Sequence, residues 1–320
     1  MPPAFPSTLV CVTISTLPPE ILSIIVQHLY NPHEHDRRTT HPSTRLKLAT
    51  YATVCRQWQP LIEAYTFRKL KLDLGKSPSE LADFQTIFAR HRVRRDALAQ
   101  LSVEPVLPDY SVRSRHRYER GSNCQANNVA FTDAIRGLFD IIQSWEAMDA
   151  SDRRRPLFLQ ILSPYAPMDR YQHPDGVDPL NYGMGGIGRG NRYLHSYLRL
   201  LGLDMGPDPL PVVRRIIKLR ITNAYRCRQT EPSSAVAIAS HLPSLEHLDL
   251  ELGADNEWRY PVMRRQHRLD FAHALTSLTL SAPPMHSFSL SYGMTTPLDH
   301  NYPIPSALHP SSPTDELSVA

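Results

Sequence analysis

The sequence LPPEILSIIVQHL, at residues 17–29, predicts a short amphipathic helix with a well-defined beginning. Prolines in a first helical turn remove N–H groups that would have no partner there, so they favour a helix start. Glu20 adds a negative charge near the positive end of the helix dipole. The apolar residues that follow have the spacing of one helical stripe, at Ile21, Leu22, Ile25 and Leu29.

A second helical run is expected between Leu46 and Tyr65, and it contains the sequence VCRQW at residues 54–58. Two or three short helices make a module of about fifty residues, which is too small to bury a large core. Such a module tends to leave an apolar face exposed, and an exposed apolar face indicates a binding partner.

LPPEIL at residues 17–22 followed by VCRQW at 54–58 resembles the F-box motif, although the connection at residues 30–44 is longer than is usual in that family. The resemblance implies a module at residues 15–67 that docks on a Skp-type adaptor, which in turn joins a cullin and a RING subunit. It implies adaptor contacts at Leu17, Pro18, Pro19, Glu20, Ile21, Leu22, Ile25, Leu29, Val54, Cys55 and Trp58. Ile25 and Trp58 are also suited to the core of the module.

An apolar pattern, Φ-x-x-Φ-x-Φ, recurs after this module. Its middle leucines are about thirty residues apart, or about twice that, which is typical of stacked leucine-rich repeats. The copies centre on Leu70, Leu101, Leu159, Leu219, Leu248 and Leu278, and the last is predicted as a strand over Leu275–Leu280.

Helical return segments are predicted between these strands, at Ser79–Arg90, Phe131–Trp145, Tyr193–Leu201 and Ser233–Leu242. The expected class is therefore mixed α/β, with a leucine-rich-repeat-like domain at residues 68–280 and a flexible Gly/Pro-rich insertion near 164–192. The alternative is an ordinary α/β domain whose strands are unrelated. The order of F-box and irregular repeats also resembles fungal F-box proteins. Residues 1–14 and 281–320 are expected to be disordered.

The composition favours an intracellular protein without a cofactor. Four cysteines lie far apart and form no CxxC pair, so neither a zinc motif nor a redox motif is indicated. No apolar run reaches the length needed to span a membrane. The formal net charge of +4 is too small to argue for nucleic-acid binding by itself. The cytoplasm or nucleus is therefore the expected location.

Four other segments contain residue types that can carry chemistry. GMGGIG at residues 183–188 matches G-x-G-x-x-G, but no strand precedes it, so a nucleotide site is not expected. The connection around His33, Glu34, His35, Asp36 and His41 has metal-binding side chains without a rigid frame. Arginines gather at residues 90–95 and 113–120, where acidic residues dilute them.

No P-loop, G-x-S-x-G or H-E-x-x-H motif is present, so an enzyme is not predicted. The resemblance implies the substrate-receptor subunit of an SCF-type ubiquitin ligase, which recruits a protein target through its repeats. The alternative is an F-box scaffold that binds partners without ubiquitination.

Overall fold

The computed structural model describes residues 17–30, 58–77, 79–114, 117–148, 155–170, 192–193, 196–202, 210–223, 228–252, 261–281 and 285–292. It separates the chain into two units, residues 1–69 with 93–98 and residues 70–92 with 99–320. The mixed α/β class is confirmed, because helices and a parallel sheet are both present.

The first unit is helical. Helix α1 (Pro19–Tyr30) packs on α2 (Trp58–Thr66), and their buried cluster contains Leu22, Val26, Trp58 and Ile62. Most of α4 (Arg92–Ala97) belongs to the same unit. Arg94 of α4 donates to Glu63 of α2 through Nε and Nη2, at 3.0 and 2.7 Å. This two-point ion pair raises the pKa of Arg94 and fixes α4 on α2.

The second unit is built on a sheet. Within the described residues, six strands follow the order β1-β2-β3-β5-β7-β8. Their bounds are β1 (Lys69–Leu74), β2 (Gln100–Pro105), β3 (Leu157–Ile161), β5 (Ile216–Thr222), β7 (His247–Leu252) and β8 (Ser287–Tyr292). The pairings from β2 to β8 are parallel. Two shorter strands, β4 (Tyr197–Leu198) and β6 (Gln229–Thr230), form a parallel pair of their own.

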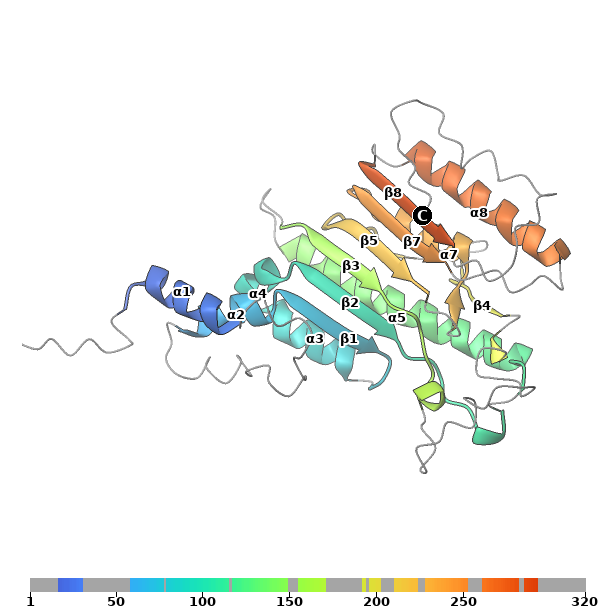
Figure 1. Cartoon of the computed structure of the whole chain (residues 1–320), viewed down its shortest axis with the longest axis horizontal. Coiled ribbons are helices and arrows are strands. Elements are labelled where there is room, and N and C mark those ends of the chain that lie inside the picture. Colours follow the sequence, from blue (N-terminus) through green and yellow to red (C-terminus); the bar gives the residue numbers. More distant parts are fainter. Residues whose placement is uncertain are drawn as a thin grey trace, which may run out of the picture. The chain divides into compact units, whose positions relative to one another are not determined.

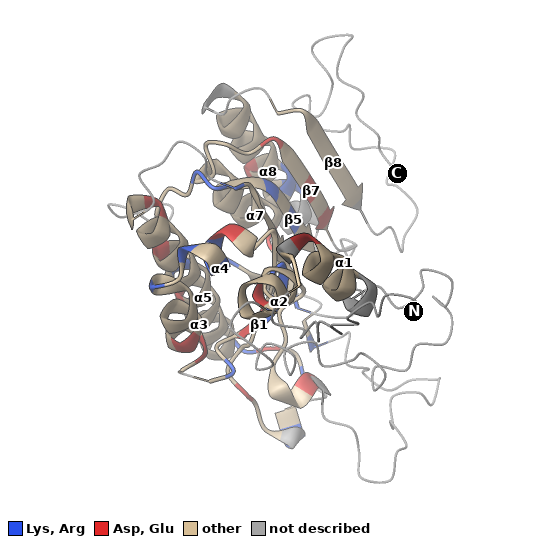
Figure 2. Ribbon diagram, turned by 90° about the vertical axis from the view of Figure 1, so that its left-hand side faces the viewer, with Lys and Arg blue, Asp and Glu red and all other residues tan. Residues whose placement is uncertain are grey.

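The helices of this unit cover one face of the sheet, as two perpendicular views show (Figures 1 and 2). They are α3 (Glu80–Ala89), α5 (Gly121–Met148), α7 (Pro232–Ser240) and α8 (Pro261–Ser281). Short 3-10 turns, η4 (Val112–Ser114) and η5 (Pro167–Arg170), lie in the connections. The predicted helices at Ser79–Arg90, Phe131–Trp145 and Ser233–Leu242 are confirmed as α3, α5 and α7.

The core lies between the sheet and these helices. Leu101, Leu159, Leu219 and Leu248 are opposite one another in register across four strands, and all are buried. Burying each such side chain contributes about 1.5–3 kcal/mol before entropic costs. Phe84 and Phe88 of α3 pack against Trp145 of α5, with ring centroids 5.3 and 5.4 Å from the indole.

Three predictions about local structure are wrong. Leu275–Leu280 lies in helix α8, where Phe271, Leu275 and Leu278 are buried at i, i+4 and i+7. The strand beside β7 is instead β8, inside the tail that was expected to be disordered from residue 281. The predicted helix at Tyr193–Leu201 contains strand β4, because Tyr197 and Leu198 pair with Gln229 and Thr230.

Candidate functional site

Helix α1 carries apolar side chains on two separate stripes. Leu22 and Val26, four residues apart, are 1% and 0% exposed and face α2. Ile21 and Ile24, three residues apart, are 43% and 50% exposed. Neither isoleucine belongs to the buried cluster, and we call this pair the outer stripe. Its exposed apolar surface is available to a partner.

The predicted adaptor-contact residues therefore divide into groups. Pro18, Glu20 and Ile21 are exposed, whereas Leu17 and Ile25 are half-buried and pack against the cluster. Leu22 and Trp58 are core residues, so any part they take in docking is indirect. The side chains of Pro19 and Leu29, together with Val54 and Cys55, lie outside the described residues. Ile24, three residues from Ile21, is also exposed, although it is not among the predicted adaptor contacts.

The sheet face opposite the helices is mainly polar, with Phe158 as its aromatic member. Side chains that alternate with the buried leucines line up across the strands, in a first row of Gln100, Phe158, Lys218, His247 and Ser287. A second row contains Ser102, Gln160, Arg220, Asp249 and Ser289. We call these two rows the open face. Most parallel sheets are covered on both faces, so a polar, partly exposed face marks this one as a surface for contacts.

Cross-strand contacts order the open face. Arg220 Nε lies 3.2 Å from Asp249 Oδ2, and its Nη2 lies 3.4 Å from Glu251 Oε2. Lys218 Nζ lies 5.0 Å from the centre of the Phe158 ring, which is a cation–π distance. Ser102 Oγ donates to Gln160 Oε1 at 3.2 Å. These side chains are held in place while remaining accessible, and neither row was predicted as a site from the sequence.

A buried ion pair fixes the connections near α5. Arg228 and Glu119 are paired, and their side chains are 0% and 1% exposed. Arg228 also donates to Ser196 Oγ at 2.8 Å and to the Tyr197 carbonyl at 3.1 Å, while Asn127 Nδ2 donates to Glu119 Oε1 at 2.5 Å. Burial lowers the pKa of Arg228 to about 9, which leaves the guanidinium charged at neutral pH. The pair has a structural role, because the two charges neutralise each other and neither side chain is accessible to a ligand.

A second polar cluster surrounds Asp169. Tyr110 and Tyr193 both donate to its Oδ1, at 2.5 and 3.0 Å. Burial is the main cause that raises the pKa of both phenols, and the Asp169 charge adds to it. Arg192 stacks 3.9 Å from the centre of the Tyr110 ring and donates to the Ser114 carbonyl at 2.7 Å. Because both phenols keep their protons at neutral pH, Tyr110 and Tyr193 are suited to hold their loops on Asp169 by hydrogen bonds and are unsuited to proton transfer.

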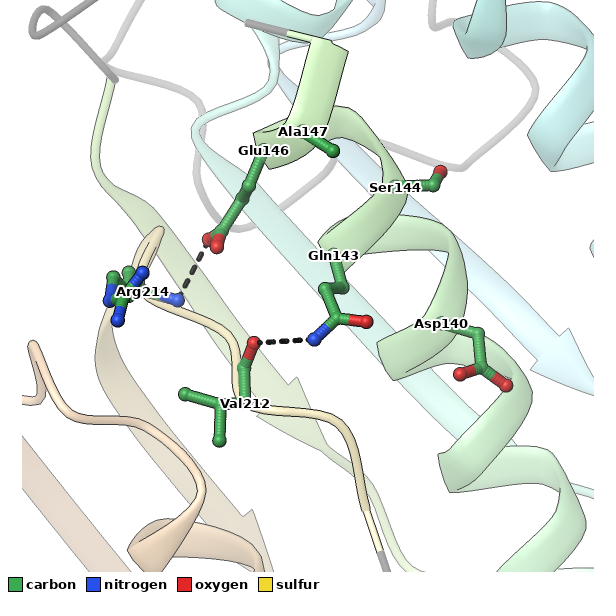
Figure 3. Close-up of a pocket in the computed structure, with 7 residues that line it drawn as sticks. All are labelled: Asp140, Gln143, Ser144, Glu146, Ala147, Val212 and Arg214. Carbon is green, nitrogen blue, oxygen red and sulfur yellow. Dashed lines mark hydrogen bonds between the residues drawn. The ribbon is translucent and has the colours of Figure 1, made fainter. Parts of the chain in front are cut away.

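Two surface pockets in this unit have no catalytic arrangement among the residues that line them. One, of about 490 Å³, lies beside the end of α5 (Figure 3). There Glu146 Oε1 accepts hydrogen bonds from the backbone N–H groups of Arg214 and Arg215, at 2.7 and 2.5 Å. Its carboxylate thus anchors the segment before β5. The other, of about 740 Å³, lies near Gly75, Leu107 and Tyr165 and is mainly apolar.

The other sequence segments add no site to the described part of the chain. The residue 183–188 glycine motif and the His33–His41 connection lie outside it. The arginines at residues 90–95 do not make a free basic patch, since Arg94 pairs with Glu63 and Arg95 is buried. Among the described helices, none is long and apolar enough to cross a membrane.

In comparisons with known proteins, no family model matches the sequence, and no curated protein matches it.

Proposed function

We propose that this chain is the substrate-receptor subunit of an SCF-type cullin-RING ubiquitin ligase. The outer stripe of α1 carries the proposal, because Ile21 and Ile24 are exposed apolar side chains within a motif that resembles an F-box. In this proposal the stripe docks on a Skp-type adaptor, and Pro18 extends it towards the start of the helix. The protein performs no chemistry itself; it holds a target close to the conjugating enzyme.

The second unit supports the receptor role by offering a separate surface for the target. The middle leucines of four sequence copies stand in register, as stacked repeat-like units require. Such stacking turns the intervening polar side chains to the opposite side of the sheet. We therefore propose the open face, with Lys218, Arg220 and Asp249 near its middle, as the target-binding surface.

The direct test measures adaptor binding by the full chain. We expect Ile21→Asp combined with Ile24→Asp to weaken the affinity for a purified Skp-type adaptor by at least about thirtyfold, as loss of about 2 kcal/mol at an apolar hot spot would do. Isothermal titration calorimetry gives the dissociation constant. Because both side chains are exposed, circular dichroism and the urea midpoint should stay close to those of the unmodified protein.

Val129→Asp is the matched control, since Val129 is another exposed β-branched residue, on α5. An unchanged dissociation constant in the double isoleucine variant would refute the docking assignment. Adaptor binding without recovery of a cullin, or without ubiquitin transfer in a reconstituted assay, would favour the alternative of a scaffold that binds partners without ubiquitination.

A further inference from the structure

Two imidazoles and one carboxylate come together where β7 begins and where the chain enters β8. Among the described residues, Glu246, His247 and His286 have potential ligand atoms that all lie within 4.8 Å of one another. We propose that these three residues bind one Zn²⁺ ion. This inference does not depend on the proposed ubiquitin-ligase function.

The backbone fixes the relative positions of the three residues. The Glu246 carbonyl accepts hydrogen bonds from the N–H groups of His286 and Ser287, at 2.8 and 3.1 Å. The Glu246 N–H donates to the Ile217 carbonyl of β5 at 2.8 Å. His247 stands opposite Ser287 in the parallel register. The ligands therefore come from two hydrogen-bonded segments, at the start of β7 and just before β8, and a metal needs to organise only their side chains.

The side-chain geometry leaves room for an ion. Glu246 Oε2 and His286 Nδ1 are 3.7 Å apart, which is too long for a direct hydrogen bond. Two ligand atoms about 2.0–2.2 Å from a tetrahedral Zn²⁺ ion are separated by a similar distance. The side chains are 44% and 68% exposed, so small rotations cost little packing.

His247 is oriented by a neighbouring hydroxyl. Its Nδ1 lies 2.7 Å from Ser287 Oγ. In the neutral imidazole whose Nδ1–H donates to this oxygen, Nε2 retains the lone pair that a metal needs. A hydrogen bond on the other ring nitrogen is the usual device that holds a ligating histidine in one tautomer and orientation.

The ligand set selects the metal. Two imidazole nitrogens and one carboxylate oxygen suit Zn²⁺, whereas Ca²⁺ and Mg²⁺ require mainly oxygen ligands. Three protein ligands leave a fourth position for water. Because β8 is the strand at the end of the sheet, an ion bound here would link it to β7 through side chains as well as through the backbone.

The test needs a local readout, since the chain has 15 histidines and any accessible imidazole is a potential ligand for a metal ion. We expect ZnCl₂ to slow amide hydrogen exchange at residues 287–292 of the full-length protein, because opening β8 would then require loss of the ion. A competition titration with a chromophoric chelator gives the dissociation constant and the stoichiometry at the same time.

His286→Ala and Glu246→Gln are the test variants, and His273→Ala, at an exposed histidine on α8, is the control. We expect each test variant to raise the dissociation constant for Zn²⁺ by at least about tenfold and to abolish the added protection of β8. The control should behave like the unmodified protein. Absence of protection in the unmodified protein, or equal Zn²⁺ affinity in the test variants, would overturn the proposal.

Discussion

At the scale of single residues, the stability of the second unit should be highly sensitive to substitution of the buried pair Arg228 and Glu119. Its two residues are far apart in the sequence, and they join the segment before α5 to the segment before β6. Removing one partner of a buried ion pair is strongly destabilising, because it leaves the other charge buried and uncompensated. Asn127 and Ser196 satisfy further polar atoms of the pair.

Arg228→Met is expected to lower the free energy of unfolding by about 3–5 kcal/mol, because it leaves the Glu119 carboxylate buried without its counter-charge. Urea denaturation at neutral pH measures this loss. The double variant Glu119→Gln with Arg228→Met removes the orphaned charge and should be more stable than Arg228→Met alone. A loss below about 1 kcal/mol in the single variant would contradict a structural role for the pair.

No sequence pattern could have predicted this pair, since Arg228 and Glu119 stand far apart and each resembles an ordinary surface charge. The same limit applies to α1. A spacing of i, i+1, i+4 includes Ile21 and Leu22 alike, and only the position of α2 decides that Leu22 is core and Ile21 is exposed. The three residues of the proposed zinc site were also beyond prediction, because the register between β7 and β8 brings them together.

At the scale of elements, hydrophobic periodicity correctly predicted those helices and strands whose type is determined by their own sequence. Strands β3 and β7 alternate buried and less buried positions throughout, β2 and β5 do so over part of their length, and α5 has apolar residues at helical spacing over several turns. The pattern at Leu275, Leu278 and Leu280 fits a repeat strand equally well as a helix that also buries Phe271. Burial against α7 decides for the helix. Strand β8 was missed because serines at every second position resemble a disordered tail.

Helix α8 can be tested through two of its leucines. Leu278→Ala should lower the free energy of unfolding by about 2–5 kcal/mol, since it leaves a cavity at a buried position. Leu269→Ala on the same helix should change it by no more than about 0.5 kcal/mol, since Leu269 is 47% exposed. Urea denaturation compares the two. Equal losses of stability in the two variants would be incompatible with the helical burial pattern.

At the scale of the whole molecule, the outer stripe of α1 and the open face belong to different units of the chain. Receptor function as proposed therefore predicts that adaptor binding and target binding can be lost one at a time. Each surface has exposed residues that contribute little to its own unit's core, so variants at either surface should fold.

Lys218→Glu combined with Arg220→Glu should abolish recovery of the target protein while leaving the affinity for the adaptor unchanged, because it reverses the two cations of the open face. Affinity purification under proteasome inhibition, followed by mass spectrometry, compares this variant with the unmodified chain. Arg155→Glu with Arg214→Glu reverses two exposed cations in the segments before β3 and β5 and is the control. An identical set of recovered proteins from all three would argue against the open face as the target-binding surface.

The order of strands in the sheet has a consequence for synthesis of the protein. Within the described six-stranded sheet, the position of each strand follows its place along the chain. A strand leaving the ribosome thus finds its earlier neighbour already made, and it never has to wait for a later segment or insert between two existing strands. Repeat-like stacks can fold by such stepwise addition, and domains generally begin to fold from the N-terminal side during synthesis. At every stage the nascent chain would expose a single growing sheet edge, which a chaperone at the tunnel exit could cover.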